Sequence, residues 1–222
     1  MQNNLFVLGY DTKHSIDRTI FLAKKNYNIT FVLSHYFPYV EKINKYKNVD
    51  LRYLDKEILV YNKTRFNTIR QIIKDVSPSV IIVHYCAYVN FHASIFSDVK
   101  PIIGILMGAE VDISNTKVPL YVRLELLFTK LFLPYLELLV TKTDRINKIC
   151  DNYNIQGKKL TIPWGININD SKKNRSNSTK LNIRKNLSLP SNSWLILSCR
   201  AVVRESNIID IVRGFHLFSN QF

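Results

Sequence analysis

The feature that most constrains this chain is a repeated alternation of short apolar runs with stretches in which apolar residues recur at helical spacing. The runs lie at 5–8, 29–33, 49–54, 80–83, 101–107, 138–141 and 160–163, and the helical stretches include 16–23 and 66–76. Most of the runs are apolar along their whole length, as strands of a parallel sheet are, because both their faces are buried. Intervening helices supply the crossovers. The alternation therefore predicts an α/β fold with a doubly wound parallel sheet.

The most membrane-like stretch is 118–140, which contains Arg123, Glu125, Lys130 and Glu137. Each charge at the centre of a bilayer costs about 2.5–3.5 kcal/mol on insertion scales, so a membrane-spanning helix is disfavoured. We expect a well-buried helix followed by a strand. As an alternative, this helix offers an apolar face to a membrane surface.

The net charge of +14 is the largest signal in the composition. It suits a nucleic acid, an anionic lipid surface or a phosphorylated small molecule, and it suits equally well a lysine-rich surface without such a partner. The sequence contains none of the patterns that mark nucleic-acid-binding modules. A nucleic-acid partner is therefore not expected.

Three cysteines, Cys86, Cys150 and Cys199, lie far apart and lack the spacing of a disulfide framework or a zinc site. The first residues carry neither the basic segment nor the small-residue cleavage site of a secretory signal. We therefore expect reduced thiols in a cytoplasmic protein.

The composition changes after residue 166, because 167–190 is rich in Asn, Ser and Lys. A new apolar run at 194–198 and a helical stretch at 208–218 follow. One strand and one helix cannot bury their apolar faces as a domain of their own. We therefore expect a first Rossmann-like domain at 1–166, a basic linker at 167–190 and the beginning of a truncated second Rossmann-like domain at 191–222.

Ligands of open parallel sheets bind beyond the carboxyl ends of the strands, so the residues after each run are candidate site residues. Gly9 follows the first run and lets backbone approach a ligand, although an ordinary tight turn explains it equally well. No G-x-G-x-x-G pattern accompanies it, which argues against a dinucleotide enzyme. His84 ends the run at 80–83 and suits acid–base chemistry near neutrality, with a buried structural histidine as the alternative.

Two carboxylates and a guanidinium complete the candidates. Glu110 and Asp112 follow Gly108 and suit hydrogen bonds to sugar hydroxyls, whereas capping of a following helix by Asp112 is the alternative. Arg200 closes the run at 194–198, where its permanent charge suits a diphosphate, with a surface arginine as the alternative. The sequence shows no Ser/His/Asp or Cys/His nucleophile arrangement and no metal triad.

Four segments, in order, resemble motifs of glycosyltransferase family 4, the retaining group with the GT-B fold of two facing Rossmann-like domains. They are PIIGILMGAEVDI at 101–113, LELLVTKTDRINKICDNYNI at 136–155, KKLTIPWGININ at 158–169 and LILSCRAVVRESNIIDIVRGFHLF at 195–218. By this resemblance, Gly108 and Asp112 match the turn of the N-terminal domain. Gly165 matches the crossing between the domains, and Arg200 matches the arginine that binds the donor phosphates.

The resemblance implies transfer of a sugar from a nucleotide-sugar donor to a hydroxyl of a saccharide or lipid-linked acceptor. A helix N-terminus and basic side chains would stabilise the departing nucleoside diphosphate, so neither a cofactor nor a metal is implied. Glu205 stands where the family often has lysine, and we expect neighbouring Arg204 to substitute. The paired glutamates of the family's donor site lie beyond Phe222, so we expect no sugar transfer from this chain alone.

The sequence thus predicts a retaining glycosyltransferase of hexosyltransferase type, or its N-terminal part, in the synthesis of surface polysaccharide or lipopolysaccharide. We expect it in the cytoplasm, peripheral on the inner face of the cytoplasmic membrane, because basic and aromatic residues favour anionic surfaces. A catalytically inactive remnant or binding module, and a GT-B sugar-nucleotide epimerase, are the alternatives. The expected site residues are His84 and Asp112 for catalysis, Gly9, Gly108 and Glu110 in the acceptor-side turns, and Gly165, Arg200 and Arg204 for donor binding.

Overall fold

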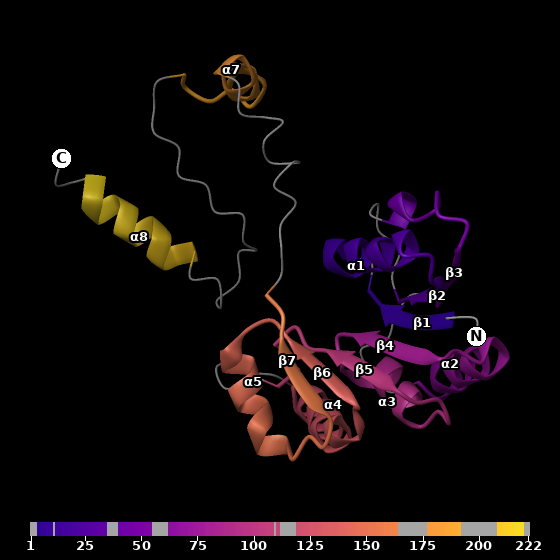
Figure 1. Ribbon diagram of the computed structural model, residues 1–222. Helices are drawn as coiled ribbons and strands as arrows, with labels where there is room; N and C mark the ends of the chain where they lie inside the picture. The colour runs from indigo at the N-terminus through magenta and orange to yellow at the C-terminus, as the bar shows by residue number, and fades with distance from the viewer. Residues whose placement is uncertain are drawn as a thin grey trace. The chain divides into compact units, whose positions relative to one another are not determined.

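The computed structural model describes residues 4–10, 12–34, 40–54, 62–108, 110–111, 119–163, 177–191 and 208–219. The chain divides into two units, Met1–Trp164 and Gly165–Phe222, each of which is described by itself. The first unit contains a β-sheet with its helices, and the described part of the second contains two helices (Figure 1).

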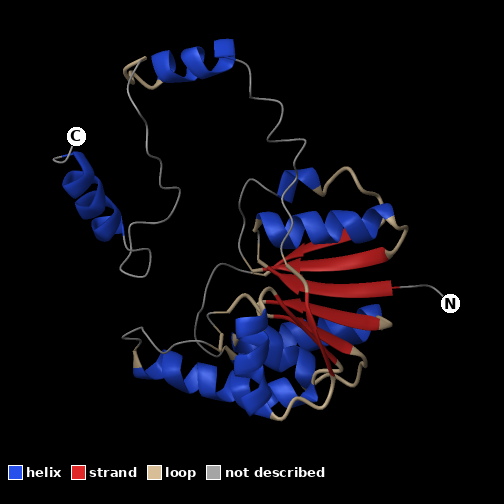
Figure 2. Cartoon of the chain, turned by 60° about the vertical axis from the view of Figure 1, so that its left-hand side comes forward, coloured by secondary structure: helices blue, strands red, loops and turns tan. Residues whose placement is uncertain are grey.

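Among the described residues, seven strands form one sheet in the order β3-β2-β1-β4-β5-β6-β7 (Figures 1 and 2). They are β1 (Asn4–Gly9), β2 (Asn28–Leu33), β3 (Val49–Tyr53), β4 (Val80–His84), β5 (Ile102–Ile105), β6 (Leu138–Thr141) and β7 (Lys158–Thr161). Every pairing between neighbours is parallel, and each strand overlaps one of the apolar runs. The predicted doubly wound parallel sheet is confirmed.

Burial on both faces of the sheet explains why the runs are apolar throughout. In β1, Phe6 and Leu8 belong to one core cluster, whereas Leu5 and Val7 belong to another. Successive side chains of a strand point to opposite faces, so a strand with a core on each side needs an apolar residue at every position. Each fully buried side chain of this kind contributes about 1.5–3 kcal/mol to the stability of the fold.

Helices cover both faces of the sheet (Figure 2). In the described ranges of the first unit they are α1 (Lys13–Lys24), η1 (Val40–Lys42), α2 (Lys63–Val76), α3 (Tyr88–Ile95), α4 (Leu120–Phe132), η2 (Leu133–Tyr135), α5 (Asp144–Cys150) and η3 (Asp151–Tyr153). Residues of α1 and η1 pack into one core cluster, and residues of α2, α3 and α5 pack into the other. Thr12, Asn62 and Thr143 cap α1, α2 and α5, because each side-chain oxygen accepts the backbone N–H three residues ahead.

Helix α4 differs from the well-buried helix that the sequence predicted, because only one of its sides packs against the core. Leu126 and Thr129 are buried, and Phe132 packs against a core cluster. On the other side, Leu120 is 73% exposed. The prediction was wrong for that side, since apolar content does not show which sides of a helix have neighbours. In the described part of the chain, no helix has both the length and the hydrophobicity that crossing a membrane requires.

The second unit contains α7 (Asn177–Asn186) and α8 (Ile208–Ser219) in its described residues. Helix α8 coincides with the helical stretch predicted at 208–218. The run at 194–198 lies outside the described residues. The assignment of 191–222 to a donor-binding domain, together with the boundaries at 166 and 190, therefore stays a prediction.

Two buried threonines allow a matched test of the packing. Thr19 in α1 and Thr129 in α4 are both fully buried, and Thr19 Oγ1 donates a 2.8 Å hydrogen bond to the Ser15 carbonyl. Thr129 Oγ1 has no partner among the described residues. An unpaired buried hydroxyl costs about 1–3 kcal/mol, so we expect Thr129→Val to raise the free energy of unfolding by about 1 kcal/mol. Thr19→Val is expected to lower the free energy of unfolding, because it removes a hydrogen bond. Urea titration measures the effect of each substitution. Equal effects of the two substitutions would contradict this account of α4.

Candidate functional site

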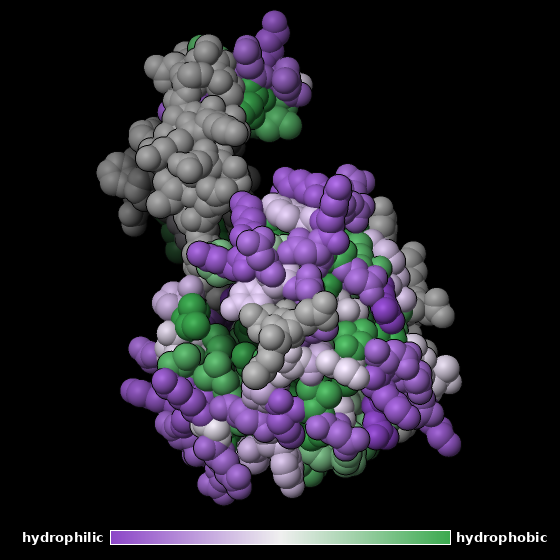
Figure 3. All heavy atoms as spheres, turned by 45° about the vertical axis from the view of Figure 1, so that its right-hand side comes forward, coloured by the Kyte–Doolittle hydropathy of each residue, from purple (hydrophilic) through white to green (hydrophobic). Residues whose placement is uncertain are grey.

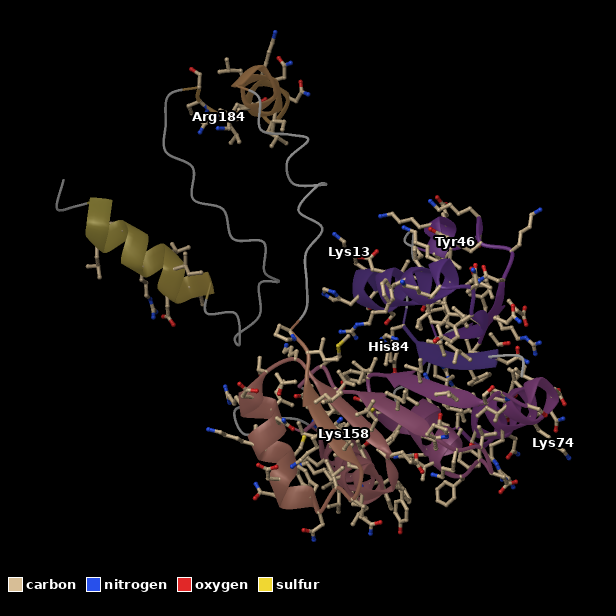
Figure 4. All side chains as sticks on the ribbon, viewed as in Figure 1. Lys13, Tyr46, Lys74, His84, Lys158 and Arg184 are labelled. Atoms are coloured by element: carbon tan, nitrogen blue, oxygen red, sulfur yellow. The ribbon has the colours of Figure 1, made fainter. Side chains whose placement is uncertain are left out.

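The carboxyl ends of β1, β4 and β5 bring several predicted site residues to one edge of the sheet. β1 pairs directly with β4, and His84 of β4 pairs with Ile105 of β5. Gly9, His84 and the turn at Gly108 therefore follow three neighbouring strands. Figure 4 shows His84 on the side of the sheet from which α1 begins at Lys13. The strand order reverses between β1 and β4, which is where open α/β sheets bind ligands.

Gly9 is explained by close packing. A Cβ at this position would lie 3.0 Å from the Phe31 ring and 3.4 Å from the Ser15 side chain. The absence of a side chain lets β1 lie close to these two residues of β2 and α1. This packing favours the structural interpretation of Gly9 over the approach of its backbone to a ligand.

His84 is buried and neutral. Only 2% of the residue's surface is exposed, and its Nδ1 lies 3.5 Å from Nη1 of Arg18. Burial, with the charge of Arg18 added to it, lowers the pKa of His84 to about 3. This environment favours the structural alternative, because the ring does not change charge near neutrality. The catalytic role stays a prediction without support from the geometry.

Glu110 holds the turn that follows β5. Its fully buried carboxylate accepts hydrogen bonds from the backbone N–H groups of Met107, at 2.9 Å, and Gly108, at 2.7 Å. Burial raises the pKa of Glu110, and these hydrogen bonds and the nearby charge of Lys142 partly oppose that rise. Gly108 has φ +119, a conformation that L residues rarely adopt. The geometry gives Glu110 a structural role in fixing the turn after β5.

Three tyrosines form an aromatic cluster at the same edge. They lie within the regions after the strands that the sequence predicted to bind ligands, although none of them was predicted individually as a site residue. Tyr10 follows β1, Tyr85 follows β4, and Tyr88 begins α3. The rings of Tyr10 and Tyr85 lie edge to face at 5.5 Å between centroids, and those of Tyr85 and Tyr88 stack at 6.1 Å. Two of the three follow a strand end directly, which is the signal in the sequence that would have identified them.

The backbone of this cluster is in an unusual conformation. Tyr85 has φ +67 and Tyr88 has φ +59, both in the left-handed region that favours glycine. Such a residue costs about 1–3 kcal/mol and persists where its surroundings hold it, often at ligand-binding sites. Burial raises the pKa of Tyr10 to about 12 and also raises the pKa of Tyr85. Both phenols therefore remain protonated donors at neutral pH.

A network of partly buried hydrogen bonds holds Arg65 beside these rings. Its Nη2 donates to Ser34 Oγ at 2.5 Å and its Nε donates to Asn90 Oδ1 at 3.2 Å. Asn90 Nδ2 in turn donates to Ser34 Oγ at 2.7 Å. Burial raises the pKa of Tyr10, and the positive charge of the guanidinium partly offsets that rise. The loop after β2, helix α2 and helix α3 thus hold one cation at the sheet edge.

More basic side chains lie near this edge. His14 and Arg18 lie in α1, and Lys142 follows β6. Burial, followed by the charge of Arg18, lowers the pKa of His14, and the charges of Lys13 and Lys142 act in the same direction. The edge therefore combines aromatic rings, hydroxyl donors and positive charge. Such a surface suits a polar ring with hydroxyl or anionic substituents.

Asp112, Gly165, Arg200 and Arg204 lie outside the described residues, so their predicted catalytic and donor-binding roles stay predictions. Of the predicted set, the structure brings Gly9, His84, Gly108 and Glu110 to one edge. Among the described side chains, no group of three or more His, Cys, Asp or Glu is arranged to hold a metal ion.

Comparison with solved structures shows which proteins have this fold. The glycosyltransferase from Rickettsia africae ESF-5 has a TM-score of 0.56 at 15% identity, over 86% of this chain and 51% of that chain. Sucrose-phosphate synthase from Thermosynechococcus elongatus has a TM-score of 0.58 at 11% identity, over 86% and 53%. The UDP-GlcNAc 2-epimerase from Neisseria meningitidis, bound to UDP-GlcNAc, has a TM-score of 0.52 at 12% identity, over 86% and 56%.

These similarities confirm the Rossmann-like α/β fold of GT-B type, and at such identities they show the fold alone. No protein-family model and no curated protein sequence matches the chain. The chain spans about half the length of the solved structures that it matches. Because transferases and an epimerase both have this fold, the reaction has to be argued from the site.

The protonation of His84 gives a direct test of its role. We expect its imidazole NMR signals to show no titration between about pH 5 and 8, because burial holds its folded-state pKa near 3. The unfolded chain takes up a proton at this residue near pH 6.5, so stability falls as the pH falls from there toward 3. His84→Gln should reduce that loss. Titration of His84 near neutrality would restore its catalytic assignment.

Proposed function

We propose that this chain is the acceptor-binding part of a retaining glycosyltransferase, which moves a hexose from a nucleotide-diphosphate sugar to a hydroxyl acceptor. The observation that carries the proposal is the edge formed by Tyr10, Tyr85, Tyr88 and Arg65, at the reversal of strand order. It is supported by the fold that the chain shares with glycosyltransferases. Fold alone does not assign the reaction, so the chemistry of this edge is the main support.

The side chains of this edge suit the two surfaces of a sugar. The partly exposed rings of Tyr10 and Tyr85 provide apolar faces for the C–H groups of a pyranose, and Tyr88, which is only 9% exposed, packs against the Tyr85 ring. Arg65 adds fixed N–H donors, because Ser34 and Asn90 hold its guanidinium in place. Donors that are held before the acceptor binds lose little freedom on binding.

The remaining roles come from the family resemblance. We assign proton transfer at the acceptor to Asp112. Gly165, Arg200 and Arg204 are assigned to the donor, where guanidinium groups would stabilise the departing diphosphate without a metal ion or another cofactor. His84 belongs to the catalytic residues only if its imidazole titrates near neutrality.

The proposed biological setting is the synthesis of surface polysaccharide or lipopolysaccharide in the cytoplasm. A saccharide, or a saccharide linked to lipid on the inner face of the cytoplasmic membrane, is the proposed acceptor. The net charge of +14 supports attraction to anionic donors and to anionic membrane surfaces.

Two other functions are tested against this one. The similarity to UDP-GlcNAc 2-epimerase favours a sugar-nucleotide epimerase, which would interconvert the configuration of a nucleotide sugar without an acceptor. Glu205, which stands where the family often has a lysine that would suit a diphosphate, favours a catalytically inactive remnant or binding module.

Incubation with nucleotide sugars separates the epimerase from the other two functions. We expect the 222-residue chain to release no nucleoside diphosphate from UDP- or GDP-hexoses, with or without saccharide acceptors, because the paired donor glutamates implied by the resemblance are not in its sequence. Proton NMR of the sugars after incubation measures both outcomes. Release of nucleoside diphosphate would refute the expected inactivity of the chain, and inversion of a ring carbon would replace the proposal by epimerisation.

The acceptor site is tested by saccharide binding to the same chain. We expect saturation-transfer NMR to detect binding of simple pyranosides, and Tyr85→Leu to weaken it about tenfold, because a lost ring contact removes roughly 1.4 kcal/mol. Tyr46→Leu is the matched control, since Tyr46 lies before β3 at the opposite edge of the sheet (Figure 4). Equal loss in both variants, with retained circular dichroism, would remove the aromatic cluster from the acceptor site.

A further inference from the structure

Helix α4 exposes a row of large apolar side chains on the side that faces away from the core. The row, named here the α4 stripe, consists of Leu120, Leu124, Leu127, Phe128, Leu131 and, in η2, Tyr135, which are between 48% and 73% exposed. At 100° per residue these positions fall within an arc about 100° wide, on the side opposite buried Leu126 and Thr129. A surface helix of a globular protein normally has polar residues on that side.

The core fixes the direction of the α4 stripe. Leu126 and Thr129 are buried on the inner side of the helix, and Phe132 packs against a core cluster. Turning the stripe inward would expose these residues instead. The helix is therefore apolar on two opposite sides, only one of which the described part of the first unit covers.

Aromatic side chains continue the apolar surface at the end of α4. The ring of Phe132 contacts those of Phe96 and Tyr135, at 5.1 and 6.3 Å between centroids. Phe96 is itself about half exposed, and its ring lies 6.0 Å from that of Phe66. The stripe thus extends beyond one helix to the end of α3 and the beginning of α2.

Cationic side chains border this surface. The Arg70 guanidinium lies 5.9 Å from the centre of the Phe66 ring, and Lys100 Nζ lies 3.4 Å from the Tyr135 carbonyl oxygen. Lys130 belongs to α4 itself and lies over another ring. Lys100 also pairs with Glu137, so the border is not purely positive. The chain as a whole carries +14, and hydrophilic side chains cover much of the face seen in Figure 3.

An apolar row bordered by cations fits the surface of an anionic bilayer. The α4 part of the row is convex and about 16 Å long, and a bilayer accepts such a surface without a matching groove. Each Lys or Arg near anionic head groups adds to the attraction between the chain and the bilayer. A second copy of the chain fits less well, because a symmetric contact would place the cations beside the stripe near those of the other copy.

We propose that the α4 stripe docks this chain on an anionic lipid bilayer, with the helix lying in the plane of the head groups. Leu124, Leu127 and Leu131 enter the boundary between head groups and acyl chains, while Arg70 and Lys130 contact lipid phosphates. The inference rests on the membrane setting of the proposed function and names the surface that makes the contact, although docking does not depend on which reaction the sheet edge performs.

Vesicle co-sedimentation of the full 222-residue chain tests the proposal. Phosphatidylcholine vesicles with and without phosphatidylglycerol separate the apolar from the electrostatic contribution. The test variant is Leu124→Gln/Leu131→Gln, which leaves the net charge unchanged and should not unfold the chain, because both side chains are about half exposed. The matched control is Phe21→Gln/Leu217→Gln, which replaces two equally exposed apolar residues of α1 and α8.

We expect the wild-type chain to bind the anionic vesicles and to bind pure phosphatidylcholine at least tenfold more weakly. The α4 double variant should lose at least tenfold in binding to anionic vesicles, and the control should match the wild type. Lys130→Gln should weaken binding to the anionic vesicles only.

Three results would overturn the proposal. They are the absence of wild-type binding, binding that is indifferent to lipid charge, and equal loss in the two double variants. Sedimentation velocity without lipid adds a fourth. If the wild type is a dimer, the α4 double variant is a monomer and that variant binds vesicles as the wild type does, the stripe is a contact with a second copy.

Discussion

Parallel pairing is the constraint on which the rest of this structure depends. Because all strands run in one direction, every loop that follows a strand emerges at the same edge of the sheet. β1 and β4 lie side by side at the centre, yet the helices that follow them pack into different core clusters. Their loops therefore diverge to opposite faces, and the residues at the point of divergence, Tyr10 and Tyr85, are brought together across 75 positions of sequence. A different strand order would separate them.

Buried polar groups then give this edge a fixed shape. The Glu110 carboxylate holds backbone N–H groups of its own turn, and Ser34 and Asn90 hold Arg65. Buried polar groups that have their hydrogen bonds specify one arrangement, because an alternative would leave a donor or acceptor unpaired at about 1–3 kcal/mol. The left-handed backbone conformation of Tyr85 and Tyr88 costs free energy, and the packing of the surrounding residues stabilises it.

The sequence predicted the strands well because burial on both faces leaves a dense apolar signal, as in 80–83. It did not predict α3 or α5, because helices of eight and seven residues leave only a short periodic pattern. It placed His84 at the correct edge but could not show that the residue is 2% exposed, since burial depends on Arg18 and other neighbours from distant segments. The contacts within the aromatic cluster could not be predicted either, since they join residues that are far apart in the sequence. The exposed side of α4 was predicted to be buried because a helix that is rich in apolar residues is usually enclosed. The donor side rests on Arg200 and Arg204, which lie outside the described residues.

Net charge alone cannot explain how such a chain would select a ligand or a surface. At physiological ionic strength, charges farther apart than about 8 Å are largely screened, so +14 acts as a weak, general attraction to anions. Selection needs contacts at short range. At the sheet edge these contacts come from tyrosine rings beside Arg65. On α4 they come from leucines beside Lys130, and leucine side chains form no hydrogen bonds. The same excess of cations is thus combined with two different kinds of apolar surface. Rigid aromatic rings beside a guanidinium suit a sugar, whereas a row made mainly of leucines suits acyl chains.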